Sequence, residues 1–132
     1  MDTAASQSKQ LLDRFLSYVR IQTSSSRDSE ETPSTPGQWD LARLLESELR
    51  ELGLDDIHLD EQCYLIARIP GPDPDAPWIG LMAHVDTTEE YSGKDVKPLV
   101  HENYGGGEIV LPAGITITPE ESPQLRRYLG ET

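Results

Sequence analysis

The residues best suited to chemistry are His84 and Asp86, which stand one residue apart directly after a strongly apolar run. That run, residues 78–83, predicts a strand covered on both faces. Because alternate residues of an extended chain point the same way, both side chains would project into a cleft at the strand's carboxyl end. A neutral imidazole is a good zinc ligand, and a nearby carboxylate can orient its ring. The spacing therefore makes His84 a candidate metal ligand and Asp86 a candidate residue of the catalytic site.

A structural interpretation of this pair stays open. One histidine does not make a metal site, and Asp86 with Thr87 can simply begin a turn while His84 satisfies a backbone group. The other histidines, His58 and His101, do not stand at ligand spacing to His84. We therefore interpret both of them as surface residues.

Three further features of the sequence are weaker candidates for a catalytic or binding role. Cys63 has no basic neighbour in the sequence that would lower its thiol pKa, which favours a packed side chain over a nucleophile. The run Ser92-Gly93-Lys94 lacks the upstream glycine of a phosphate-binding loop. The three glycines at 105–107 predict a flexible turn, or alternatively a backbone that lines a ligand cleft.

Two amphipathic helices are predicted ahead of these residues. One covers about residues 8–20, and a second begins after Thr35. The run from Thr35 to Gln38 has the pattern of a capping box, in which the Thr35 hydroxyl would accept a backbone N–H. Gly53 is placed to end this helix in the left-handed conformation. Between the helices, residues 23–34 are polar, Ser-rich and acidic, which predicts an exposed loop.

The second half of the chain has strand-like patterns. Prolines at four positions from 70 to 77 cannot donate ladder hydrogen bonds, so this stretch is predicted to be a surface connection before the strand at 78–83. Together the predicted elements indicate an α/β fold with a mixed sheet flanked by helices. The remaining predicted elements are short: strands at 57–59, 64–69, 108–111 and 115–118, and a helix at 123–129 with Ser122 as its cap.

Composition excludes several classes of protein. The 132 residues include 24 acidic residues against 11 Lys and Arg, a net charge of −13, which argues against nucleic acid or an anionic membrane as partner. A single cysteine excludes an internal disulfide, and no apolar run approaches the roughly 20 residues of a membrane span. Residues 1–10 are polar and lack the order of a signal peptide, so we expect a cytoplasmic protein. Nothing in the composition predicts an oligomeric state.

Four runs of residues carry a family resemblance: PSTPGQW at 33–39, AHVDT at 83–87, SGKDVKP at 92–98 and ENYGGGEI at 102–109. Together they make the sequence similar to the opening of peptidase T, a family of dinuclear zinc aminopeptidases that remove the N-terminal residue from tripeptides. The resemblance extends from about Leu11 to the C-terminus. The pattern His-x-Asp alone is shared by the wider group of two-zinc exopeptidases and deacylases, whereas the loop that follows it is more specific to the tripeptidases.

This resemblance implies that His84 binds one of two zinc ions and that Asp86 holds and tunes its imidazole. The family's bridging aspartate, its Glu-Glu pair, a further acidic ligand and a distant histidine are not among these residues. We therefore expect residues 1–132 to be an N-terminal fragment of a metallopeptidase catalytic domain, without the rest of that domain or its lid. The substrate would be a small peptide, and the fragment alone would be inactive because it supplies one ligand only.

Two alternatives remain at this point. The protein could be another two-zinc hydrolase, such as a dipeptidase or an N-acyl amino acid deacylase. It could also be a small acidic α/β binding domain without enzymatic activity, in which His84 and Asp86 are structural. Residues beyond 132 would discriminate the enzyme from the binding domain, because the enzyme requires further acidic and histidine ligands. Substrate profiling of the full-length protein would separate the two-zinc hydrolases from one another.

Overall fold

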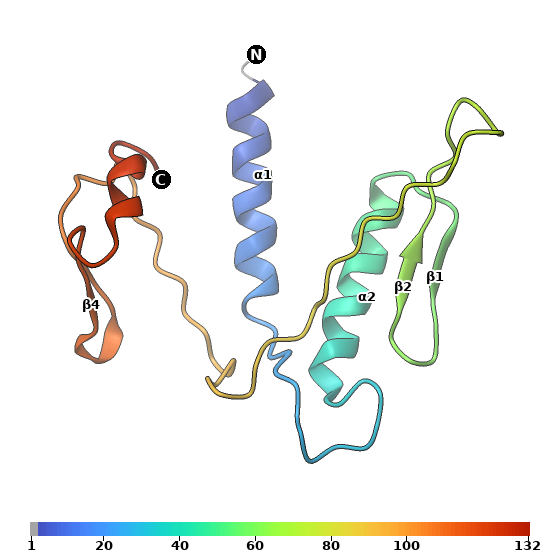
Figure 1. Ribbon diagram of the computed structural model, residues 1–132, viewed down its shortest axis with the longest axis horizontal. Helices are drawn as coiled ribbons and strands as arrows, with labels where there is room; N and C mark the ends of the chain where they lie inside the picture. The colour runs from blue at the N-terminus through green and yellow to red at the C-terminus, as the bar shows by residue number, and fades with distance from the viewer. Residues whose placement is uncertain (1–2) are drawn as a thin grey trace. The chain divides into compact units, whose positions relative to one another are not determined.

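The computed structural model describes residues 3–132, so the first two residues of the polar N-terminal stretch lie outside the described part. The described residues divide into a first unit that ends at Lys97 and a second unit, Pro98–Thr132. None of the helices in the described part is long and apolar enough to cross a membrane. The first unit contains α1 (Thr3–Tyr18), α2 (Pro36–Glu51), β1 (Ile57–Leu59) and β2 (Leu65–Ala67), and the second contains β3 (Ile109–Val110), η1 (Pro112–Gly114), β4 (Thr116–Ile117) and η2 (Pro123–Tyr128) (Figure 1).

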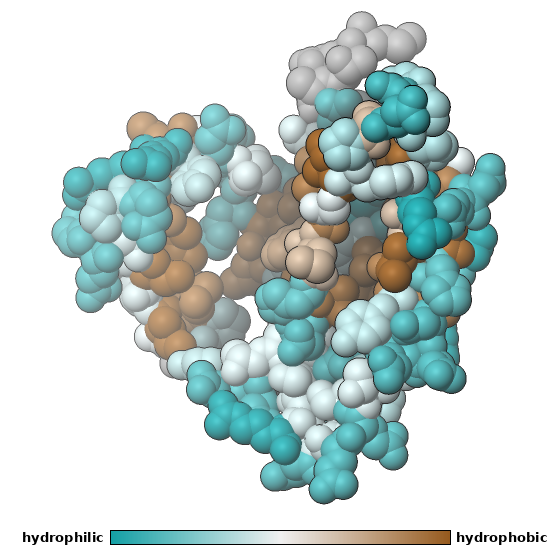
Figure 2. Space-filling model, turned by 45° about the vertical axis from the view of Figure 1, so that its right-hand side comes forward, coloured by the Kyte–Doolittle hydropathy of each residue, from teal (hydrophilic) through white to brown (hydrophobic). Residues whose placement is uncertain are grey.

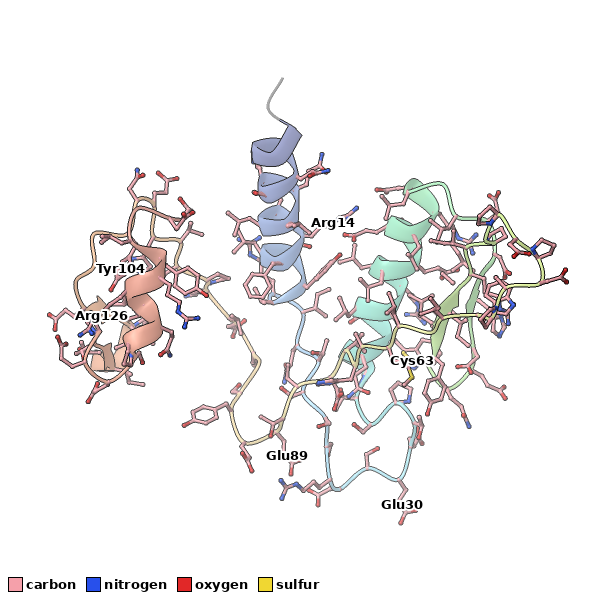
Figure 3. The ribbon with its side chains drawn as sticks, turned by 45° about the horizontal axis from the view of Figure 1, so that its top comes forward. Arg14, Glu30, Cys63, Glu89, Tyr104 and Arg126 are labelled. Atoms are coloured by element: carbon pink, nitrogen blue, oxygen red, sulfur yellow. The ribbon has the colours of Figure 1, made fainter. Side chains whose placement is uncertain are left out.

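Helix α1 confirms the first predicted helix, although it starts earlier and ends at Tyr18. The guanidinium of Arg14 lies 3.5 Å from the carboxylate of Glu48 on α2, and Figure 3 shows Arg14 extending from the side of α1 that faces α2. The hydroxyl of Tyr18 donates a hydrogen bond to the same carboxylate. The two helices of the first unit are thus joined by polar contacts, while Leu11 and Phe15 on α1 stay exposed.

Helix α2 confirms the second predicted helix, but its predicted capping box is wrong. Thr35 is the N-cap residue and makes no side-chain cap hydrogen bond. Its hydroxyl donates instead to the carbonyl oxygen of Ser24, at 2.8 Å, because the preceding loop passes close to the start of the helix. At the other end Gly53 takes a φ of 86°, as predicted. The N–H groups of Gly53 and Leu54 donate to the carbonyls of Arg50 and Leu49, which forms a Schellman motif.

The small core of the first unit is centred on α2. Its buried residues include Leu41 and Ala42, and the hairpin of β1 and β2 contacts the same helix (Figure 1). The two strands pair in antiparallel register, with His58 opposite Ile66. Asp60 closes the turn of the hairpin, since its carboxylate accepts the N–H groups of two residues that follow it. The predicted strands at 57–59 and 64–69 are therefore confirmed, the second in shortened form.

The predicted strand at 78–83 is wrong. These residues follow an extended but irregular path, and within the described part of the chain no strand pairs with them. Leu81 is 95% exposed and Met82 is 100% exposed. A strand needs a hydrogen-bonded neighbour and covered faces, and the described residues supply neither here. The fold is thus an α/β arrangement of helices and short strands, but its two sheets are antiparallel pairs and not the predicted mixed sheet.

The second unit is built around a short hairpin. Strands β3 and β4 pair in antiparallel register, which confirms the predicted strands at 108–111 and 115–118 in shortened form. The brief predicted helix is present as the 3₁₀ helix η2, but Ser122 makes no side-chain cap hydrogen bond. Tyr104 connects the ends of the unit, because its N–H donates to Glu131 and its carbonyl accepts from Gly130, both at 2.8 Å. Gly106 takes a φ of 83°, in keeping with the predicted glycine turn.

Candidate functional site

The candidate site is the pair His84 and Asp86, on the irregular segment that follows the exposed apolar run. The imidazole Nδ1 lies 3.0 Å from Oδ1 of Asp86, so the two side chains point together as the spacing predicted. The His84 side chain is 84% exposed and that of Asp86 is 43% exposed. The pair therefore lies at the surface of the described chain, and not in the predicted cleft at the end of a buried strand.

This geometry suits a metal ligand. A carboxylate accepts a hydrogen bond from the Nδ1–H of a neutral imidazole, and in that tautomer the free lone pair lies on Nε2. Metal-binding histidines are commonly oriented in this way by a carboxylate on their other nitrogen. In the described residues Nε2 has no hydrogen-bond partner, and the ring's exposure leaves that atom accessible. His84 and Asp86 thus fit a zinc site as a ligand and its orienting group.

The pair supplies only one ligand of such a site. Within residues 3–132 no group of three or more His, Cys, Asp or Glu side chains gathers to hold a metal ion. His58 lies exposed on β1 and His101 lies exposed in the second unit, which agrees with their interpretation as surface residues. The described residues therefore do not form a complete zinc site by themselves.

Cys63 does not contribute a reactive group to this site. It is partly buried in the turn of the β1–β2 hairpin, where its φ is 69°. Burial raises the pKa of the Cys63 thiol, an effect that Arg43 opposes and Asp60 reinforces. A raised pKa leaves less of the thiolate, which is the nucleophilic form. The interpretation of Cys63 as a packed side chain therefore agrees with the structure.

Thr87, directly after Asp86, is paired with the polar loop that precedes α2. The N–H of Ser25 donates to the carbonyl of Thr87 at 2.9 Å, and the N–H of Thr87 donates to the carbonyl of Thr23 at 3.3 Å. These bonds form a parallel β-bridge between Ser24 and Thr87. Thr23 is only 4% exposed, so the prediction of a wholly exposed loop at 23–34 is wrong at its first residue, where the loop packs against the start of α2.

A charged contact joins the same two segments. The backbone N–H of Arg27 donates to one carboxylate oxygen of Glu89 at 2.9 Å, and its guanidinium lies 2.7 Å from the other. Glu90 lies 3.7 Å from the guanidinium as well. Figure 3 shows Glu89 on the segment that follows the candidate site, and Glu30 at the outer part of the polar loop. The loop thus contacts the chain on the C-terminal side of His84 and Asp86.

Two glycines mark the closest approaches in this region. A Cβ at Gly93 would lie 2.8 Å from the hydroxyl oxygen of Ser24, and one at Gly37 would lie 1.8 Å from the carbonyl oxygen of Gln22. Both glycines belong to the runs that carry the family resemblance. The sequence did not single out Ser24, Ser25, Arg27 and Glu89. The two glycines are features of the sequence that indicate a close approach of segments here.

The chain is similar to proteins named peptidase T. It is 47% identical over 129 residues to the one from Alkaliphilus oremlandii, 47% over 125 residues to the one from Halothermothrix orenii, and 43% over 127 residues to the one from Bacillus anthracis. These matches cover 92 to 94% of this chain and 31 to 32% of each relative, so the chain spans about a third of the length of the curated relatives it matches. No protein-family model matches it. The resemblance to peptidase T is confirmed.

Proposed function

We propose that this chain belongs to a zinc-dependent aminopeptidase that releases the N-terminal residue from tripeptides. The observation that carries the proposal is the oriented pair of His84 and Asp86 in a chain 42 to 47% identical to peptidase T. Residues 1–132 would form the N-terminal portion of the catalytic domain of a cytoplasmic enzyme. The full-length protein is this chain within a protein of its relatives' length.

In this proposal His84 and Asp86 have separate tasks. His84 would bind one of two zinc ions through Nε2, since Nδ1 is engaged by Asp86. Asp86 fixes the orientation of the ring and its tautomer, and its negative charge strengthens the imidazole as a ligand. The zinc ions, when bound, supply Lewis-acid activation of water and of the peptide carbonyl. Among residues 3–132 no three His, Cys, Asp or Glu side chains gather to hold a metal ion, so the 132-residue chain alone is expected to be inactive.

The experiment is a substrate comparison on the purified full-length protein. We expect two zinc ions per chain, release of the N-terminal residue from tripeptides, and loss of activity when a chelator removes the metal. Dipeptides and N-acyl amino acids serve as competing substrates. Faster cleavage of either would reassign the protein to another kind of two-zinc hydrolase. A folded protein that binds no zinc and cleaves none of these substrates would instead support a binding domain.

A further inference from the structure

We propose that Ser24, Ser25 and Arg27 form a clamp that positions His84 and Asp86. This loop clamp holds Thr87 and Glu89, on the C-terminal side of the pair. The inference rests on the proposed function, because it concerns how the proposed zinc ligand is held in place. The three residues act on the pair through Thr87 and Glu89 and do not touch it themselves, so they are positioning residues.

Within the described structure, the loop clamp holds the backbone next to His84 and Asp86 in place. On the N-terminal side, residues 78–83 are irregular and have no paired strand among the described residues. On the C-terminal side, the N–H and the carbonyl of Thr87 are both hydrogen-bonded to the loop. The hydroxyl of Ser25 adds a second donor to that carbonyl, at 3.1 Å. Fixing Thr87 limits the backbone freedom of the adjacent Asp86, and through it the direction of the imidazole.

Arg27 provides a second attachment, two residues beyond Thr87. Its backbone N–H and its guanidinium contact the two oxygens of one carboxylate, that of Glu89. The Arg27 side chain is 75% exposed but that of Glu89 is only 34% exposed, so the carboxylate is partly shielded from water. A pair with two donors on one carboxylate has a more defined direction than a single charge contact.

The clamp is built on the most buried part of the chain. The carbonyl of Ser24 accepts the hydroxyl of Thr35, and the carbonyl of Thr23 accepts the side-chain amide of Gln38 at 3.5 Å. Gln38 is only 6% exposed and lies on α2 one turn before the buried Leu41. A rigid helix and its core therefore support the loop, and the loop in turn holds Thr87.

The test uses matched pairs of variants in the full-length protein. Arg27→Ala and Ser25→Ala weaken the clamp. Arg50→Ala is the control for the first, because Arg50 and Glu46 form an exposed pair on α2 with the same 2.7 Å separation. Ser29→Ala is the control for the second, because the Ser29 hydroxyl accepts a local N–H within the same loop. Each variant is measured for zinc affinity by chelator competition, for kcat and KM, and for its melting midpoint.

We expect Arg27→Ala to weaken binding of one zinc ion by about tenfold, at the lower end of what loss of an orienting group causes. A similar fall in kcat should accompany it, with KM close to the wild-type value, because misplaced groups affect the reaction more than substrate binding. Ser25→Ala should act in the same direction but less, because it removes one hydroxyl hydrogen bond whereas Arg27→Ala removes an ion pair. Arg27→Lys should restore part of the affinity, and both controls should match the wild type.

Two different outcomes separate the two proposals. If the wild type binds zinc and cleaves tripeptides while both clamp variants do so equally well, the clamp has no positioning role. The same conclusion follows if Arg50→Ala and Ser29→Ala lose as much zinc affinity as their partners, or if the losses only follow the melting midpoint. A folded wild type that neither binds zinc nor cleaves tripeptides refutes the proposed function, and the inference with it.

Discussion

His84 and Asp86 show how two side chains can share the work of one ligand site. The imidazole presents Nε2, and the carboxylate at 3.0 Å from Nδ1 sets the ring's orientation and tautomer. Removing each side chain should therefore have a different effect. A metal site loses the ion with its ligand, whereas it loses reactivity first when only the orienting charge is removed.

His84→Ala in the full-length protein should abolish binding of one zinc ion and most of the tripeptidase activity. Asp86→Asn should lower kcat about tenfold to a hundredfold while more zinc is retained, because the amide still meets the ring but lacks the charge. Zinc content and tripeptide hydrolysis are measured on both purified variants. Two zinc ions and normal activity in His84→Ala would refute the ligand assignment. Equal zinc loss in both would make Asp86 a direct ligand or a structural residue.

Tyr18 gives the contact between α1 and α2 a dependence on pH. Burial, together with the hydrogen bond to Glu48 and its charge, raises the pKa of Tyr18 to about 12, and Arg14 opposes the shift. In the unfolded chain the phenol would ionise near about pH 10. The stabilisation from the neutral phenol is thus fully present below that pH, and is lost as the pH rises toward 12.

Ultraviolet titration of tyrosine ionisation checks this shift. The variant Tyr18→Phe should lose the component that titrates at about 12, because that component belongs to Tyr18. Tyr128→Phe, at an exposed tyrosine of the second unit, serves as the control and should keep it. The free energy of unfolding of Tyr18→Phe should also fall less between pH 10 and 12. The same alkaline component in both variants would contradict the assignment.

Among the elements, α2 depends on a close approach at its first turn. A methyl group at Gly37 would lie 1.8 Å from a carbonyl oxygen of the loop, and the backbone there cannot shift cheaply. Gly37→Ala should lower the free energy of unfolding of the full-length protein by about 2 to 3 kcal/mol, measured by denaturant titration. Gly105→Ala, where nothing lies within 4 Å of the new Cβ, is the matched control. Equal stability of the two variants would show that the helix tolerates the methyl group.

The elements that could be predicted from the sequence are those whose signals are local. The apolar spacing of α1 and α2 and the glycine at position 53 describe helices without reference to the rest of the chain. The cap at Thr35 failed because its hydroxyl binds Ser24, a partner in the preceding loop. The prediction of a strand at 78–83 was wrong because an apolar pattern cannot show whether a neighbouring strand exists.

Of the candidate site, too, only the local contact could be predicted from the sequence. His84 and Asp86 stand two positions apart, so the contact between their side chains could be predicted from their spacing. The bridge that holds them joins Ser24 to Thr87, which are 63 residues apart, and no periodic pattern connects such positions. Serine and threonine in a polar loop are also ordinary, so their types alone gave no sign of the loop clamp.

On the scale of the whole molecule, the described chain buries few apolar side chains. Leu41 and Ala42 are the buried hydrophobic residues of its described part, whereas Ile79, Leu81 and Met82 are at least 86% exposed. Figure 2 shows apolar side chains, in brown, reaching the surface among hydrophilic ones. A buried side chain the size of Leu41 contributes about 1.5 to 3 kcal/mol and the methyl of Ala42 contributes less, so a core this small offsets little of the conformational entropy lost on folding.

The 132-residue chain by itself should therefore be marginally stable and should associate through its apolar surface. We expect it to bind a hydrophobic dye, to show weak protection of its amides in hydrogen exchange, and to have no tripeptidase activity at any zinc concentration. Leu81→Ser combined with Met82→Ser should reduce dye binding and association without changing helix content, because these side chains lie outside both helices and are almost fully exposed. Leu41→Ser is the contrasting variant, because it removes a buried side chain from α2 and should lower helix content. A monomeric chain that melts cooperatively with well-protected amides would show instead that contacts within residues 1–132 suffice for a stable domain.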